Sequence, residues 1–165
     1  MTPTLSVIIP GYNRPEPLKY TLRSVSAAAA KLNAPTEVLL VDDGSQPSLE
    51  TQLAGFDAGI SIRHIRQPNQ GSIVARLTGL AAATGTFVHF LDSDDLVHSE
   101  KYLAQVRAHE QGGADVTYDD FATATLGDHY AVKTFAPAAL LPIVTEPARL
   151  FLGSCGASPG RPIDY

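Results

Sequence analysis

Three aspartates follow directly after an apolar run in the stretch Phe87–Asp95. The run, Phe87–Leu91, is short and rich in branched and aromatic residues, which is typical of a buried strand. Asp92, Asp94 and Asp95 come at its carboxyl end, where open α/β sheets place their ligands. Three carboxylates this close repel one another unless a cation neutralises them. The stretch therefore predicts a Mg²⁺ or Mn²⁺ site that holds a phosphorylated ligand, and the alternative is a solvated acidic turn.

Polar residues also follow two other apolar runs. The loop Pro10–Arg14 comes after Leu5–Ile9, and Asp42–Ser45 comes after Glu37–Val41. Taken alone, Asp42–Ser45 is a turn, because Asp, Gly and Ser are turn formers. Parallel strands point their carboxyl ends the same way, however, so both loops and the Asp92 cluster are expected at one edge of a sheet.

Side chains at this edge suit a nucleotide. Tyr12 could stack on a base while Asp43 accepts a hydrogen bond from a ring N–H of that base. Arg14 and Arg76 could contact phosphates or balance the acids. Taken singly, each arginine is more often a surface residue.

The elements that would position these side chains alternate along the chain. Strands are expected at 5–9, 37–41, 60–65, 87–91 and 114–118, and helices at 18–32, after Ser48, after Ser72 and after Ser99. In the helix after Ser72, the residues Ile73, Leu77, Leu80 and Ala81 are spaced to share one face. Strands that alternate with helices predict an α/β fold with a mostly parallel sheet flanked by helices.

The pattern weakens after Asp119. Residues 121–135 alternate loosely around Leu126–Asp128, which could form a hairpin turn. Residues 153–162 are rich in Gly, Pro and Ser without periodicity. We therefore expect one α/β region over residues 1–120 and a different, partial region over residues 121–165.

Composition excludes several classes of protein. The 165 residues are 44% hydrophobic and 18% charged, enough for a folded core. A net charge of −5 argues against a nucleic-acid partner and against electrostatic membrane binding. The single cysteine, Cys155, rules out an internal disulfide, which favours a cytoplasmic location. We expect no signal peptide and no transmembrane segment, because no stretch has a suitable apolar length.

Two common nucleotide motifs are missing. The first strand is not followed by G-x-G-x-x-G, which disfavours an ordinary dinucleotide fold, and no G-x-x-x-x-G-K-[ST] occurs. An aspartate-based phosphotransfer domain is also disfavoured. A phosphatase of that kind would carry D-x-D after its first strand, where Pro10–Tyr12 stand, and a receiver would want a lysine where Asp119-Asp120 stand.

Four motifs occur in order at suitable spacing. They are Pro10–Arg14, Val41–Ser45, Asn69–Gly71 with Ala75-Arg76, and Leu91–Asp95. Together they resemble the nucleotide-sugar-binding half of family 2 glycosyltransferases, which have the Rossmann-like GT-A fold. The resemblance covers residues 5–120 and leaves the acceptor half of the fold incomplete.

The resemblance implies a role for each motif. Pro10, Tyr12 and Arg14 would line the nucleotide pocket, and Asp43 would recognise a uracil-like base. Gly71 and Arg76 would flank the nucleotide and its diphosphate. Asp92, Asp94 and Asp95 would form the D-x-D element for ribose and metal, with Asp94 and Asp95 as metal ligands.

The same resemblance implies metal-dependent transfer of a sugar, typically with inversion, from a UDP-sugar or similar donor to an unidentified glycan, lipid or protein acceptor. Two departures weaken that expectation. The third motif ends in Leu77 where the family usually has Asn, and no Glu-Asp-type base motif follows the D-x-D. Glu146 and Asp164 are the acids near the end, and neither has a matching context. No catalytic base is assigned, and the alternative is a truncated, catalytically silent module that binds nucleotide and metal.

Overall fold

The computed structural model describes residues 4–112, 116–117, 122–126 and 132–137. The chain divides into two compact units, Met1–Thr117 and Tyr118–Tyr165. In chain order the elements are β1 (Leu5–Gly11), α1 (Pro15–Leu32), β2 (Thr36–Asp42), α2 (Leu49–Gln52), β3 (Ile62–Arg66), α3 (Ser72–Ala82), β4 (Phe87–Phe90), α4 (Lys101–Gly112), β5 (Ala122–Leu126) and β6 (Val132–Pro137). The functional division expected between residues 120 and 121 stays a prediction.

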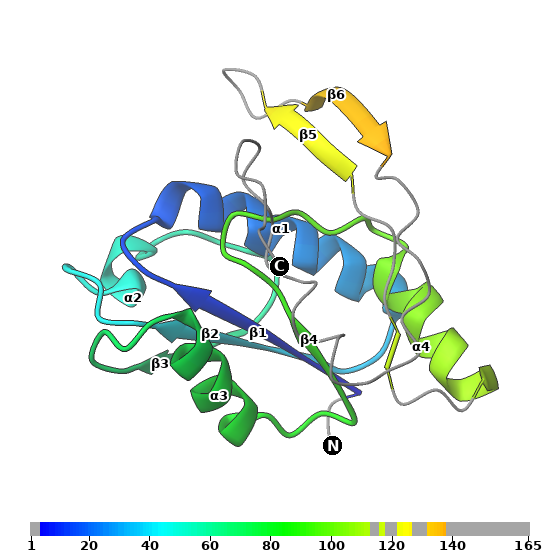
Figure 1. The fold of residues 1–165 in the computed structure, drawn as a ribbon, viewed down its shortest axis with the longest axis horizontal. Helices are drawn as coiled ribbons and strands as arrows, with labels where there is room; N and C mark the ends of the chain where they lie inside the picture. The colour runs from blue at the N-terminus through cyan, green and yellow to red at the C-terminus, as the bar shows by residue number, and fades with distance from the viewer. Residues whose placement is uncertain (1–3, 113–115, 118–121, 127–131, 138–165) are drawn as a thin grey trace, which may run out of the picture. The chain divides into compact units, whose positions relative to one another are not determined.

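A parallel sheet forms the centre of the first unit (Figure 1). Its strand order is β3-β2-β1-β4, and all three pairings are parallel. In the register of the sheet, Ile8 of β1 lies between Leu39 of β2 and Phe90 of β4. Every residue of β1 is buried, so the apolar run at 5–9 is the middle of the core. The predicted α/β fold with a mostly parallel sheet is confirmed for this unit.

Helices α1 and α4 cover one face of this sheet. Helix α1 begins at Pro15 and is capped at Asn33, whose backbone is left-handed with φ 53°. Its apolar face, with Leu18 and Leu22, packs onto alternate residues of β1 and β2 in one core cluster. Tyr102 of α4 joins the same cluster.

Helix α3 covers the opposite face and turns out differently from its sequence pattern. Its buried residues are the small ones, Ala75 and Gly79. A Cβ added to Gly79 would lie 2.3 Å from Cγ2 of Ile8, so the helix approaches the sheet too closely for a side chain there. The apolar residues that the sequence pattern places on one face, Ile73, Leu77 and Leu80, are instead exposed large hydrophobic residues.

Strand β4 is also less buried than its sequence predicts. Phe87 and His89 are half-buried on the α1 and α4 side, whereas Val88 and Phe90 are each 39% exposed. Helix α3 packs on β1 and β2 rather than on β4, and β4 ends the strand order within the described residues. The expectation of a fully buried strand at 87–91 is therefore wrong for its α3-side residues.

The second unit contains an antiparallel hairpin of β5 and β6, with Thr123 opposite Ala136. This agrees with the hairpin suggested by the sequence, although its turn lies outside the described residues. The strand expected at 114–118 also lies mostly outside them, and Val116 and Thr117 are in no strand.

The ring of His89, in β4, faces Tyr102 of α4, and its Nδ1 lies 3.3 Å from the hydroxyl of Tyr102. Burial lowers the pKa of His89 from 6.5 to about 3, and the charge of nearby Lys101 adds to the effect. Between these two pH values, His89 is protonated in the unfolded chain and neutral in the folded chain. The free energy of unfolding must therefore fall as the pH falls below 6.5.

We expect this effect to reach at most about 2 kcal/mol between pH 7 and pH 5. Urea unfolding of the wild type and of His89→Gln at both pH values measures it, because the variant has no imidazole to protonate. His98→Gln, which alters an exposed histidine, is the matched control. An equal loss of stability in the wild type and in His89→Gln would contradict the assignment.

Candidate functional site

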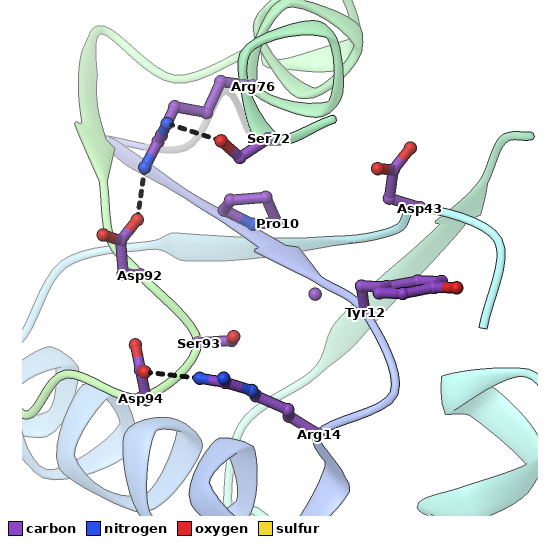
Figure 2. Close-up of a pocket in the computed structure, with 10 residues that line it drawn as sticks. Pro10, Tyr12, Arg14, Asp43, Ser72, Arg76, Asp92, Ser93 and Asp94 are labelled. Carbon is purple, nitrogen blue, oxygen red and sulfur yellow. Dashed lines mark hydrogen bonds and ion pairs between the residues drawn. The ribbon is translucent and has the colours of Figure 1, made fainter. Parts of the chain in front are cut away.

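A pocket of about 340 Å³ opens at the carboxyl edge of the parallel sheet (Figure 2). Its lining comes from the exits of β1, β2 and β4 and from the N-terminal part of α3. The lining residues are Pro10, Gly11, Tyr12, Arg14, Asp43, Ser72, Arg76, Asp92, Ser93 and Asp94. The structure thus brings together the predicted site residues except Gly71 and Asp95, and adds Gly11, Ser72 and Ser93.

Tyr12 lies at one end of the pocket, on a loop that is tied to the exit of β2. The next residue, Asn13, is left-handed with φ 52°. Its backbone N–H donates to Oγ of Ser45 at 2.9 Å, and its Oδ1 accepts from the backbone N–H of Gln46 at 2.9 Å. Tyr12 itself is 48% exposed, so the loop holds an aromatic ring that a flat ligand could cover.

The two adjacent aspartates at the exit of β2 have different environments. Asp42 is buried, and its carboxylate accepts from the backbone N–H of Ser45 at 2.8 Å and of Leu49 at 3.0 Å. Nε of Arg66 lies 3.9 Å from the same carboxylate. Asp42 does not line the pocket. It holds the loop that supports Tyr12, so it is a positioning residue.

Asp43 faces the pocket and ties down the loop before α3. Its Oδ1 accepts from Nε2 of Gln67 at 2.8 Å and from the backbone N–H of Gln70 at 2.9 Å, and its Oδ2 accepts from the backbone N–H of Gly71 at 2.8 Å. Burial alone would raise the pKa of Asp43, but these three hydrogen bonds lower it below its ordinary value. An ionised carboxylate therefore stands beside Tyr12. Gly71, predicted to flank the nucleotide, supports Asp43 instead of lining the pocket.

The other end of the pocket is charged (Figure 2). Nη1 of Arg14 lies 3.1 Å from Oδ2 of Asp94, and both side chains are about half exposed or more. Arg76 pairs with Asp92 and also donates from Nη1 to Oγ of Ser72 at 3.4 Å. Each arginine therefore neutralises one carboxylate and lies where an anionic ligand could compete for it.

Asp95 follows Asp94 and lies outside the pocket lining. Partial burial raises the pKa of its carboxyl group, and the neighbouring charges of Asp92 and Asp94 raise it further, while Lys101 opposes them. This is the mutual repulsion that three clustered carboxylates are expected to show.

The residues fit a hard divalent cation by their chemistry, since carboxylate oxygens are what Mg²⁺ and Mn²⁺ take, and Asp95 carries charge repulsion that a cation would relieve. Within the described part of the chain, no group of three or more His, Cys, Asp or Glu side chains converges as a ready metal cage. A cation would therefore need oxygens from the ligand as well as from Asp94 and Asp95.

Comparison with known proteins decides the family. The sequence model described as "Glycosyl transferase family 2" matches residues 6–146. The chain belongs to glycosyl transferase family 2.

Relatives in family 2 are longer. An uncharacterised glycosyltransferase of Rickettsia conorii is 31% identical over 107 residues, which are 65% of this chain and 17% of that protein. The succinoglycan biosynthesis protein ExoO of Rhizobium meliloti is 28% identical over 149 residues, which are 88% of this chain and 41% of that protein. The chain therefore spans less than half the length of either.

Among solved structures, S. aureus TarS 1–349 in complex with UDP-GlcNAc is 26% identical to this family 2 chain, with a TM-score of 0.54. The match covers 67% of this chain and 32% of that one. The expected GT-A-type fold is confirmed by this likeness together with the family assignment.

Several supporting residues of the site escape sequence reasoning. Asn13 and Ser45 lie within two of the sequence motifs, but the hydrogen bond between them was not predicted. Gln67, which donates to Asp43, lies outside every motif. Within the described residues, no helix is long and apolar enough to cross a bilayer.

Glu146 and Asp164, the acids considered as a catalytic base, lie outside the described residues, and so do the residues around them.

Proposed function

We propose that this chain binds a nucleoside-diphosphate sugar, a UDP-sugar, as the donor half of a metal-dependent, inverting glycosyltransferase. One observation carries the proposal: a single pocket joins an exposed aromatic ring and an ionised carboxylate at one end to an arginine and aspartate cluster at the other. The first end suits a base and the second a diphosphate. The family assignment and the UDP-GlcNAc complex of S. aureus TarS support the same ligand class.

The residues of the pocket would contact different parts of the nucleotide-sugar. Tyr12 would stack on the base, and Asp43 would accept a hydrogen bond from its ring N–H. Arg14 and Arg76 would exchange their present carboxylate partners for phosphate oxygens, with which guanidinium groups form forked hydrogen bonds. Asp94 and Asp95 would hold Mg²⁺ or Mn²⁺, which when bound neutralises the charge of the leaving diphosphate.

The decisive experiment measures the melting temperature with UDP, with Mn²⁺ and with both. A ligand that binds only the folded state at 100 times its Kd adds about 2.7 kcal/mol of stability, so saturating UDP with Mn²⁺ should raise the melting temperature clearly. Uridine with Mn²⁺ is the control, because it has the base without the diphosphate. No shift with UDP in either condition would overturn the proposal.

The second candidate is a silent module that binds nucleotide and metal without transferring sugar. Its ground is that the pocket accounts for binding, whereas no base for the transfer step is assigned among the described residues. Incubation with UDP-sugars and assay for released UDP separates the two. Turnover supports the enzyme, and UDP binding without transfer or hydrolysis supports the module.

A further inference from the structure

Gln67 is the first residue after β3, and its side chain contacts Asp43 at the base end of the pocket. Its backbone N–H donates to the carbonyl oxygen of Asp42 at 3.0 Å, so the main chain of Gln67 is fixed without help from its side chain. Its Nε2 donates to Oδ1 of Asp43 at 2.8 Å. Sugar transfer and nucleotide binding, as proposed above, assign no role to this side chain.

The orientation of the Gln67 amide follows from charge. Its Oε1 is buried and has no hydrogen-bond partner among the described residues. A buried acceptor without a partner is unfavourable, so another contact must hold the amide in this position. That contact is the bond to Asp43, because a flipped amide would point Oε1 at an ionised carboxylate, which has no hydrogen to donate.

The consequence for Asp43 is a nearly filled set of acceptor positions. A carboxylate offers about four lone-pair sites, two on each oxygen. Oδ1 already accepts from Gln67 and from the Gln70 backbone, and Oδ2 accepts from the Gly71 backbone. One position on Oδ2 is left, so Asp43 can accept a single hydrogen bond from a ligand.

We infer that Gln67 is a specificity-determining residue, which restricts Asp43 to one bond and thereby selects a base with a single N–H, such as uracil, against guanine. This inference rests on the proposed nucleotide-sugar function. Guanine presents two parallel donors, N1–H and the N2 amino group, which pair with both oxygens of a carboxylate. With Oδ1 occupied, the second donor finds no acceptor on Asp43, and sites built on hydrogen bonds discriminate on that ground.

Size alone does not make this selection. Tyr12 is shared between the pocket and a second hollow of about 610 Å³, lined by Gln67, Asn69 and residues around them. A ring larger than uracil therefore has open space beside Tyr12, and the hydrogen-bonding capacity of Asp43 is what differs between the bases.

The test compares UDP, GDP and inosine diphosphate in the wild type and in Gln67→Met, with dissociation constants measured by calorimetry. Met keeps the length of the side chain and removes its donor, which frees a position on Oδ1. Inosine diphosphate has the purine ring of GDP without the N2 amino group. We expect the GDP-to-inosine-diphosphate affinity ratio to rise about tenfold or more in Gln67→Met, the usual worth of a hydrogen bond to a charged group. The GDP-to-UDP ratio should rise with it.

Two controls make the result specific. Gln52→Met removes another amide that donates to one acceptor, the carbonyl oxygen of Pro47, and should leave both ratios unchanged. Gln67→Ala should repeat the effect of Gln67→Met, which keeps the test valid if one variant folds poorly. If the role of Gln67 is purely structural, its replacement should weaken the binding of UDP, GDP and inosine diphosphate by the same factor.

Unchanged ratios in both Gln67 variants, with UDP still bound by the wild type, would overturn the inference and leave the proposed function standing. An equal gain for GDP and inosine diphosphate would also overturn it, because that result means added room rather than an added acceptor. Failure of the wild type to bind UDP would overturn the proposed function and this inference together.

Discussion

Replacement of Asp42 by Asn should cost about 3 kcal/mol of the free energy of unfolding, a large share of the roughly 5–15 kcal/mol of an ordinary domain. The Asp42 carboxylate accepts from two backbone N–H groups, those of Ser45 and Leu49, one on each oxygen. Asn has one acceptor oxygen, and its amino group would face the other N–H. One buried donor is then unsatisfied, and the charge that Arg66 complements is lost.

Urea unfolding followed by circular dichroism measures this loss. Asp57→Asn is the matched control, because Asp57 also accepts from a backbone N–H, that of Gly59 at 2.8 Å, but on an exposed turn. We expect less than about 1 kcal/mol for that variant. A loss of the same small size in Asp42→Asn would show that the loop after β2 holds its shape without the carboxylate.

Weaker UDP binding should accompany the lost stability. Asp42 holds Ser45, whose hydroxyl accepts from the backbone N–H of Asn13, and Asn13 follows Tyr12. Loosening this chain of hydrogen bonds frees the Tyr12 loop, which must then be ordered again when a base stacks on it. Calorimetric titration with UDP should therefore give a larger dissociation constant for Asp42→Asn than for the wild type.

Sequence reasoning works where the geometry of the sheet decides the outcome. Parallel strands bring their carboxyl ends to one edge, so apolar runs that each end in polar residues predict that Tyr12, Asp43 and Asp92 meet. It fails where packing distance decides. Helix α3 turns Gly79 rather than Leu77 toward the sheet, since the approach to Ile8 leaves no room for a side chain. The hydrophobic period shows which residues share a face of the helix, but in α3 the small residues Ala75 and Gly79 face the sheet.

The hydrogen bonds within the site also cannot be predicted from the sequence. Asp42 and Asp43 are neighbours of the same type, yet Asp42, the last residue of β2, supports a loop, whereas Asp43, the first residue after the strand, faces the pocket. Which acceptor positions of Asp43 remain open depends on the path of the loop that contains Gln67 and Gln70. That path is a property of the folded chain rather than of any spacing.

Asp94→Ala and Asp95→Ala should each abolish the Mn²⁺-dependent part of UDP binding while the fold survives. Both residues come after the end of β4 and neither belongs to the hydrophobic core, so we expect the core to survive their replacement. We expect melting temperatures within about 2 °C of the wild type, as for most surface substitutions. Mn²⁺ should no longer strengthen UDP binding in either variant, a loss of more than about tenfold, the scale on which even supporting residues of metal sites act.

Calorimetry with UDP in Mn²⁺ and in EDTA measures the two parts of the affinity, and Asp57→Ala controls for the loss of a surface charge. Unchanged Mn²⁺-dependent affinity in both variants would contradict the proposed roles of Asp94 and Asp95 as metal ligands. The EDTA values should differ between the variants. Asp94 pairs with Arg14 at 3.1 Å, so its removal leaves that guanidinium available to the diphosphate and should strengthen metal-free binding. Asp95→Ala leaves the Arg14 pair in place and should not. Stronger UDP binding in EDTA would therefore distinguish Asp94, which also restrains Arg14, from Asp95, which does not.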